Sequence, residues 1–155
     1  MMSNRFSEGA VRAGEGIYEG DFYLWTEVTA SLLQDGKFDE VDIRSLIEEI
    51  ESMGRSEKRE LKSRLIVLLM HLLKWQYQPG KRSESWRSTI SEQRICLEAL
   101  LEDSPSLKQY LLDNFESCYE KARVKAADET GMRLDIFPIA LPFTKEETLS
   151  SNYLP

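Results

Sequence analysis

The stretch LeuIleValLeuLeuMetHisLeuLeu, residues 65–73, decides the fold. It forms the middle of a helix predicted from about Ser56 to Gln78 and is apolar on every face except at His71, the one histidine of the chain. A helix on a protein surface has a single apolar stripe, so a helix that is apolar all round is expected to be buried among others. The sequence therefore predicts a helical bundle. It leaves open what role the titratable imidazole of His71 has at the centre of that bundle.

Apolar residues at helical spacing predict two helices before this segment. The first covers Tyr18–Asp35, with Asp21 as a candidate N-cap. The second begins after Asp42 and places five apolar residues on one side: Ile43, Leu46, Ile47, Ile50 and Met53. Gly54 either ends this helix or kinks it into the central one, because glycine weakens a helix interior.

Turn residues mark where the later helices begin and end. Pro79-Gly80 is expected to stop the central helix, because proline cannot continue the hydrogen-bond ladder. A fourth helix begins at Ser83 or Ser85 and ends near Glu102. A fifth is predicted to run to Gly131, starting with Ser104 as its cap and Pro105 in its first position.

The residues after Gly131 suggest an extended strip laid over the bundle, because Phe137-Pro138 and Pro142-Phe143 interrupt any helix. ThrLysGluGlu at 144–147 matches a capping box for one short last helix. No run alternates with a period of two. The predicted fold is therefore an all-α, single-domain bundle of about five helices over residues 17–155, with a flexible N-terminal tail at residues 1–16.

Composition indicates an ordinary soluble protein, with 41% hydrophobic and 30% charged residues. Residues 65–73 are far short of the roughly 20 needed to cross a bilayer, and residues 1–16 lack the apolar run of a signal peptide or anchor. Cys96 and Cys118 have no CxxC spacing, which favours buried free thiols over a redox or metal pair. We therefore expect a cytoplasmic protein.

The net charge of −7 is unevenly distributed. Lys and Arg against Asp and Glu give balances of −8 for residues 1–54, +6 for 55–94 and −5 for 95–155. Helices of opposite sign lying side by side explain this most simply, and the alternative is an external anionic partner.

Several phrases resemble a bacterial family common in cyanobacteria, the domain-of-unknown-function family 29. They are LeuIleGluGluIleGluSerMetGlyArgSerGluLysArgGluLeu (46–61), LeuMetHisLeuLeuLysTrpGlnTyrGlnPro (69–79) and SerTrpArgSerThrIleSerGluGlnArg (85–94). TyrGluGlyAspPheTyrLeuTrp (18–25) and TyrLeuPro (153–155) are similar to it too. The resemblance covers about Tyr18 to Pro155. It implies a helical fold but no established activity, so no catalytic residue is carried over.

One candidate site combines His71 with Glu49 and Arg94, as general base or ligand with charged neighbours. On the central helix His71 lies on a polar seam, the line of Glu60, Arg64, His71 and Gln78. The alternative is structural: a buried histidine bonded to a carboxylate and an arginine paired with a glutamate. A ferritin-like di-metal site needs repeated GluxxHis pairs, whereas Leu68 stands three residues before His71. HExxH, GxGxxG and the Walker loop are absent, and we expect no metal and no cofactor.

A second candidate is a basic and aromatic patch within residues 74–94: Lys74, Trp75, Lys81, Arg82, Trp86 and Arg87. Such side chains suit phosphate contact and base stacking, although tryptophans beside a Pro-Gly turn also pack as edges of a core. A pI near 4.9 argues against nucleic acid as the main partner.

The sequence thus favours a non-catalytic helical module that binds protein partners and self-associates as a homodimer. The first alternative is a protein that engages nucleic acid or another polyanion through residues 74–94, with no membrane involved. An enzyme using His71 as general base is the second.

Overall fold

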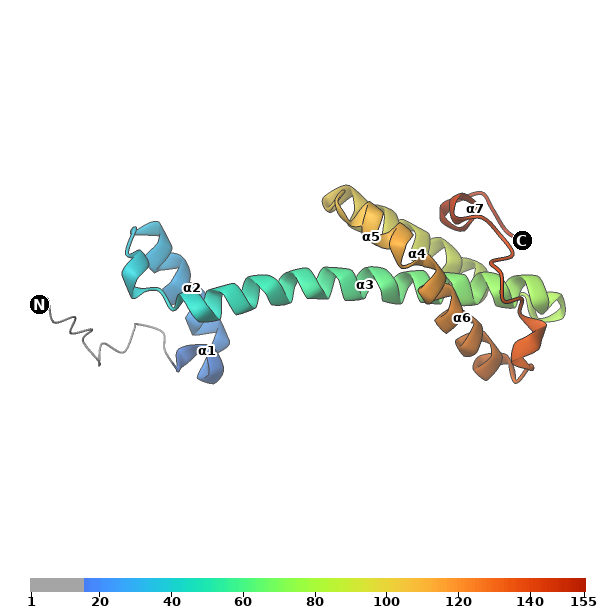
Figure 1. The fold of residues 1–155 in the computed structure, drawn as a ribbon, viewed down its shortest axis with the longest axis horizontal. Coiled ribbons are helices and arrows are strands. Elements are labelled where there is room, and N and C mark those ends of the chain that lie inside the picture. Colours follow the sequence, from blue (N-terminus) through green and yellow to red (C-terminus); the bar gives the residue numbers. More distant parts are fainter. Residues whose placement is uncertain (1–15) are drawn as a thin grey trace, which may run out of the picture. The chain divides into compact units, whose positions relative to one another are not determined.

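The computed structural model describes residues 16–155, and among these every regular element is a helix (Figure 1). The predicted all-α fold is therefore confirmed. The chain divides into two compact units, residues 1–54 and 55–155, and each is described by itself below. Except for Gly16, the predicted N-terminal tail lies outside the described residues.

The first unit contains α1 (Ile17–Gly20), α2 (Phe22–Gln34), the 3₁₀ turn η1 (Phe38–Glu40) and the beginning of α3. The single helix predicted for residues 18–35 is interrupted at Asp21, which is a correction to that prediction. The carboxylate of Asp21 accepts a hydrogen bond from the Leu24 N–H at 3.0 Å. A side chain that captures an N–H in this way starts a new helix, so Asp21 is the predicted N-cap but caps α2 alone.

Helix α3 (Ile43–Tyr77) joins the predicted second and central helices without interruption. Gly54 therefore lies inside a helix, where glycine costs about 1 kcal/mol relative to alanine. At the start of α3, the Asp42 carboxylate accepts the Ser45 N–H at 3.2 Å, as predicted for a cap. At its end, the 3₁₀ turn η2 (Pro79–Lys81) follows, as the proline predicts.

In the second unit, α4 (Glu84–Asp103) begins after Ser83, whose hydroxyl accepts the Trp86 N–H at 3.2 Å. Of the two candidate starts of this helix, Ser83 and Ser85, the N-cap is therefore Ser83. Helix α4 is followed by two helices, α5 (Leu107–Asp113) and α6 (Phe115–Thr130), where a single one was predicted.

The predicted fifth helix is wrong in two respects. Residues 104–106 form a turn rather than a capped first turn, because the Leu107 N–H bonds to the Ser104 carbonyl at 3.0 Å instead of to a hydroxyl. The helix also breaks at Asn114, whose side-chain amide donates to the Tyr110 carbonyl at 2.8 Å. The main-chain N–H of Asn114 bonds to the same carbonyl at 3.1 Å, so side chain and backbone share this acceptor at the end of α5. At the end of α6, Gly131 takes the left-handed conformation (φ 68°) that glycine adopts without steric cost.

The C-terminal strip contains the 3₁₀ turn η3 (Leu134–Ile136) and helix α7 (Lys145–Leu149). The capping box predicted at 144–147 is present: Thr144 Oγ1 accepts the Glu147 N–H at 3.0 Å, and the Glu147 carboxylate accepts the Thr144 N–H at 2.8 Å.

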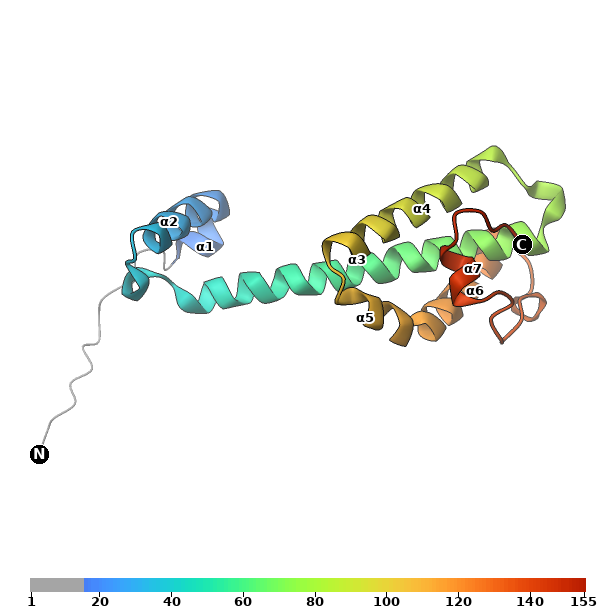
Figure 2. The ribbon, with the colours of Figure 1, turned by 90° about the horizontal axis from the view of Figure 1, so that it is seen from above.

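The core of the second unit lies around residues 61–73 of α3. Figure 2 shows α4, α5 and α6 alongside this part of the helix, and each contributes buried side chains. The strip adds Phe137 and Phe143 to the same core. The predicted burial of the central segment is confirmed: Leu65, Leu68, Leu69, Leu72 and Leu73 are each at most 1% exposed.

Candidate functional site

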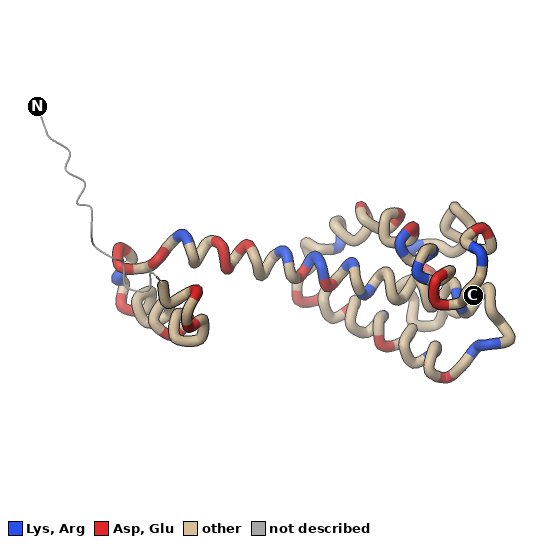
Figure 3. The backbone as a smooth tube through the Cα atoms, turned by 90° about the horizontal axis from the view of Figure 1, so that it is seen from below, with Lys and Arg blue, Asp and Glu red and all other residues tan. Residues whose placement is uncertain are grey.

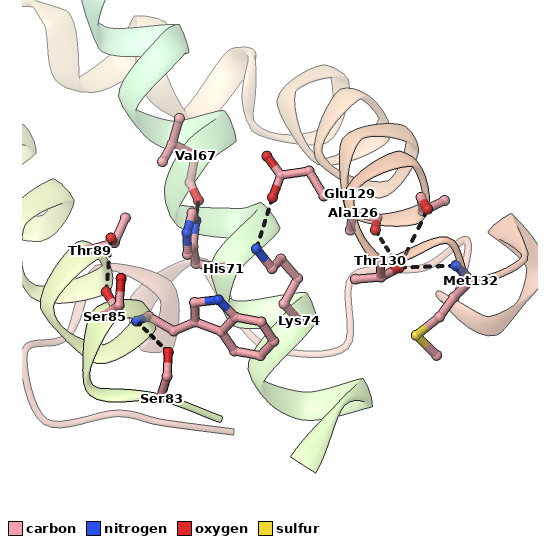
Figure 4. Close-up of polar contacts among 12 residues, drawn as sticks. Val67, His71, Lys74, Ser83, Ser85, Thr89, Ala126, Glu129, Thr130 and Met132 are labelled. Carbon is pink, nitrogen blue, oxygen red and sulfur yellow. Dashed lines mark hydrogen bonds and ion pairs between the residues drawn. The ribbon is translucent and has the colours of Figure 1, made fainter. Parts of the chain in front are cut away.

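His71 is half-buried and bonds to the backbone of its own helix (Figure 4). Its Nδ1 lies 2.8 Å from the Val67 carbonyl oxygen, which can only accept, so Nδ1 carries the proton and donates it. Burial is the main cause that lowers the pKa of His71, and the Val67 hydrogen bond acts in the opposite direction. The structural interpretation of His71 predicted a hydrogen bond to a carboxylate. The structure instead has a hydrogen bond to the backbone carbonyl of Val67.

Arg94 is the most tightly held of the predicted site residues, since only 6% of it is exposed. Its guanidinium donates to three backbone carbonyls of the C-terminal strip: Nε to Thr148 at 2.9 Å, Nη1 to Tyr153 at 2.8 Å and Nη2 to Glu147 at 3.3 Å. Arginine presents several donors in a rigid fork, which suits this set of acceptors. Arg94 therefore fastens α7 and the last residues to α4.

Glu49 has its partner within the first unit, where it accepts a hydrogen bond from the Tyr18 hydroxyl at 3.0 Å. This bond is the main cause that raises the pKa of Tyr18. On the polar seam, Arg64 pairs with Glu60 at 2.8 Å and donates to Gln93 at 3.4 Å. Glu49, His71 and Arg94 thus each contact a different part of the protein, and these contacts do not bring the three into one site.

The basic and aromatic patch is partly internal. Lys74 is only 7% exposed, its Nζ lies 2.8 Å from a Glu129 carboxylate oxygen, and the same ammonium sits 4.6 Å from the centre of the Trp86 ring. Figure 4 shows Lys74 reaching from α3 to Glu129 on α6. Such a contact joins two helices, so Lys74 and Trp86 serve packing.

The other cations of the patch are exposed. Arg82 donates to the Trp75 carbonyl at 2.8 Å and lies 5.1 Å from the centre of its ring, while Lys81 and Arg87 reach solvent. Lysine and arginine are marked along the backbone in Figure 3. Binding of a polyanion to these three cations stays a prediction: it should weaken steeply with added salt and in Lys81→Ala/Arg82→Ala.

The second unit also has an open hollow of about 510 Å³ beside α4. Its lining mixes apolar and charged side chains, including Ile95, Leu101, Glu98 and Lys108. Arg94 borders it too, but the Arg94 guanidinium is already bonded to the strip. Ser91, Glu102 and Ser151 complete the polar lining of the hollow.

The feature that the sequence did not reveal is apolar exposure in the first unit. Of the fourteen large apolar side chains that are exposed among residues 16–155, nine lie between residues 22 and 53. They are Phe22, Tyr23, Leu24, Leu33, Phe38, Ile43, Ile47, Ile50 and Met53. The stripe of the predicted second helix was visible in the sequence, but its spacing gives no sign of whether anything covers it.

Within residues 16–155, His, Cys, Asp and Glu residues nowhere gather in threes in an arrangement that could hold a metal ion. The helices formed by the same residues include none that could span a membrane.

These observations define a class: a helical protein in which His71, Glu49 and Arg94 make contacts that support the fold. Its family follows from comparison with known families. The chain belongs to DUF29, a domain of unknown function, whose family model matches residues 17–154. Comparisons with curated proteins and with solved structures found no match. The membership confirms the resemblance seen in the sequence and brings no activity with it.

Proposed function

We propose that the protein is a non-catalytic helical interaction module that self-associates. The observation that carries this proposal is the first unit, which leaves most of its large apolar side chains in water. Its described part buries three residues, Trp25, Thr29 and Val41, while nine large apolar side chains remain exposed. A concentration of exposed apolar surface on one part of a protein marks a site of protein contact.

The contacts of the candidate catalytic residues support the same proposal. All three guanidinium nitrogens of Arg94 donate to backbone carbonyls, and Lys74 is paired with Glu129. Both groups stabilise the second unit, which leaves neither of them available for catalysis. We place the protein in the cytoplasm, because Cys96 and Cys118 are free thiols and Cys118 is buried.

Sedimentation velocity of the full chain, from nanomolar to high-micromolar concentration, tests the proposal. We expect a sedimentation coefficient that rises with concentration to that of a dimer. A chain that stays monomeric over the whole range would refute self-association. Because apolar contacts carry the proposed association, it should persist at high salt, whereas contacts made only by exposed charges would weaken there.

A further inference from the structure

We infer that the occupant of the exposed stripe on α3 is the same stripe of a second copy, packed antiparallel with Gly54 at the contact. This inference rests on the proposed self-association and specifies its surface. The stripe, here called the isoleucine face, consists of Ile43, Ile47, Ile50 and Gly54. The three isoleucines are 41%, 51% and 57% exposed.

The four residues share one side of α3. Their spacing of four, three and four residues keeps them within a narrow sector at 100° per residue. It is also the spacing of the contact seam in coiled coils. The side of α3 that faces the rest of the first unit is a different one, since Glu49, which bonds to Tyr18, lies well away from this sector.

The same side of α3 continues beyond Gly54 into Leu61, Leu65 and Leu68, which are at most 1% exposed. There the helix packs into the core of the second unit. Before Gly54 the side has the same apolar chemistry, but its three isoleucines are exposed. One helix face thus carries two apolar stretches, of which the earlier is exposed and the later is buried.

A second copy fits this face, because four, three, four reads the same in both directions and the stripe carries an isoleucine at one end and a glycine at the other. When two isoleucine faces meet antiparallel, Ile47 of each copy lies beside Ile50 of the other, and Ile43 lies over Gly54. A two-fold symmetric interface requires this kind of self-complementary pattern. A parallel pair instead sets Gly54 against Gly54 and leaves a gap there.

Gly54 has a physical role in this arrangement. A Cβ built at Gly54 would meet nothing within 4 Å, so the fold of the chain gives no steric reason for a glycine. Yet glycine in a helix interior is unfavourable. Against a second helix the missing side chain makes room for Ile43 of the partner copy, as small residues do where helices approach closely.

Gly54→Gln tests the surface with two readouts of opposite sign. Glutamine has a higher helix propensity than glycine, so the urea midpoint of the monomer at low concentration should rise. Its side chain would fill the space for Ile43 of the partner copy, so we expect the dimer dissociation constant to increase at least tenfold. Ile50→Asp should weaken the dimer likewise, while Ile95→Asp, at an exposed isoleucine of α4, should leave it unchanged.

Direction is tested by oxidative cross-linking in a Cys96→Ser background. An Ile47→Cys chain is mixed with an Ile50→Cys chain of different mass. Antiparallel packing predicts mainly mixed disulfides, whereas parallel packing gives disulfides within each kind. A chain that forms dimers unaffected by Gly54→Gln and Ile50→Asp, or that cross-links mainly within each kind, overturns this inference while leaving self-association intact. A purely monomeric chain refutes both.

Discussion

Replacing Arg94 by methionine should release the C-terminal strip. Methionine keeps an apolar stem of similar length but removes the donors that hold the carbonyls of Thr148 and Tyr153 at 2.9 and 2.8 Å. A hydrogen bond from a charged donor contributes about 1.5–3 kcal/mol, and the freed carbonyls regain some water. We expect a loss of about 3 kcal/mol, a large share of the roughly 5–15 kcal/mol that stabilises a domain.

The assay is urea denaturation of the second unit within the full chain, followed by far-ultraviolet circular dichroism. Arg87→Met is the matched control, because Arg87 is an exposed arginine on the same helix. Hydrogen exchange should also speed up at residues 145–155 in Arg94→Met. A loss below about 1 kcal/mol, or one equal to that of the control, would refute the view that Arg94 fastens the strip.

Three other perturbations test the second unit. In urea denaturation, Lys74→Met should lower the free energy of unfolding less than Glu129→Gln does, because Glu129→Gln leaves a buried ammonium without its carboxylate. The reverse order would contradict the pairing. Burial lowers the pKa of His71 from its usual 6.5, so stability should be complete above pH 6.5 and fall as the pH drops below it. His71→Gln should flatten that fall, and an unchanged pH profile would count against it. Tyr119→Phe removes the hydroxyl that donates to the Pro138 carbonyl at 2.6 Å and should lower the free energy of unfolding by about 1 kcal/mol. An unchanged free energy of unfolding would show that this bond does not stabilise the fold.

Local chemistry made much of the fold predictable. The apolar run at 65–73 implied burial, and Asp21, Ser83 and Thr144 begin helices because their side chains capture backbone N–H groups nearby. These signals act over a few residues. At Asn114, periodicity alone did not show that the helix breaks into α5 and α6.

The candidate site was harder to predict because its contacts join distant parts of the chain. Arg94 bonds to carbonyls 53, 54 and 59 residues away, and Lys74 to a carboxylate 55 residues away. Nothing in the spacing of either residue distinguishes a cation that reaches a distant carbonyl from one that reaches solvent. The exposure of the isoleucine face was unpredictable for a similar reason. An apolar stripe shows which residues share one side of a helix, but it does not show what covers that side.

The molar mass of the full chain in solution, measured by light scattering during gel filtration at high-micromolar loading, tests the central claim most directly. The claim is that the isoleucine face joins two copies. It predicts twice the 18.0 kDa of one chain for the unaltered protein and a single chain for Ile50→Asp. A mass of one chain for both, or of two chains for both, would contradict it.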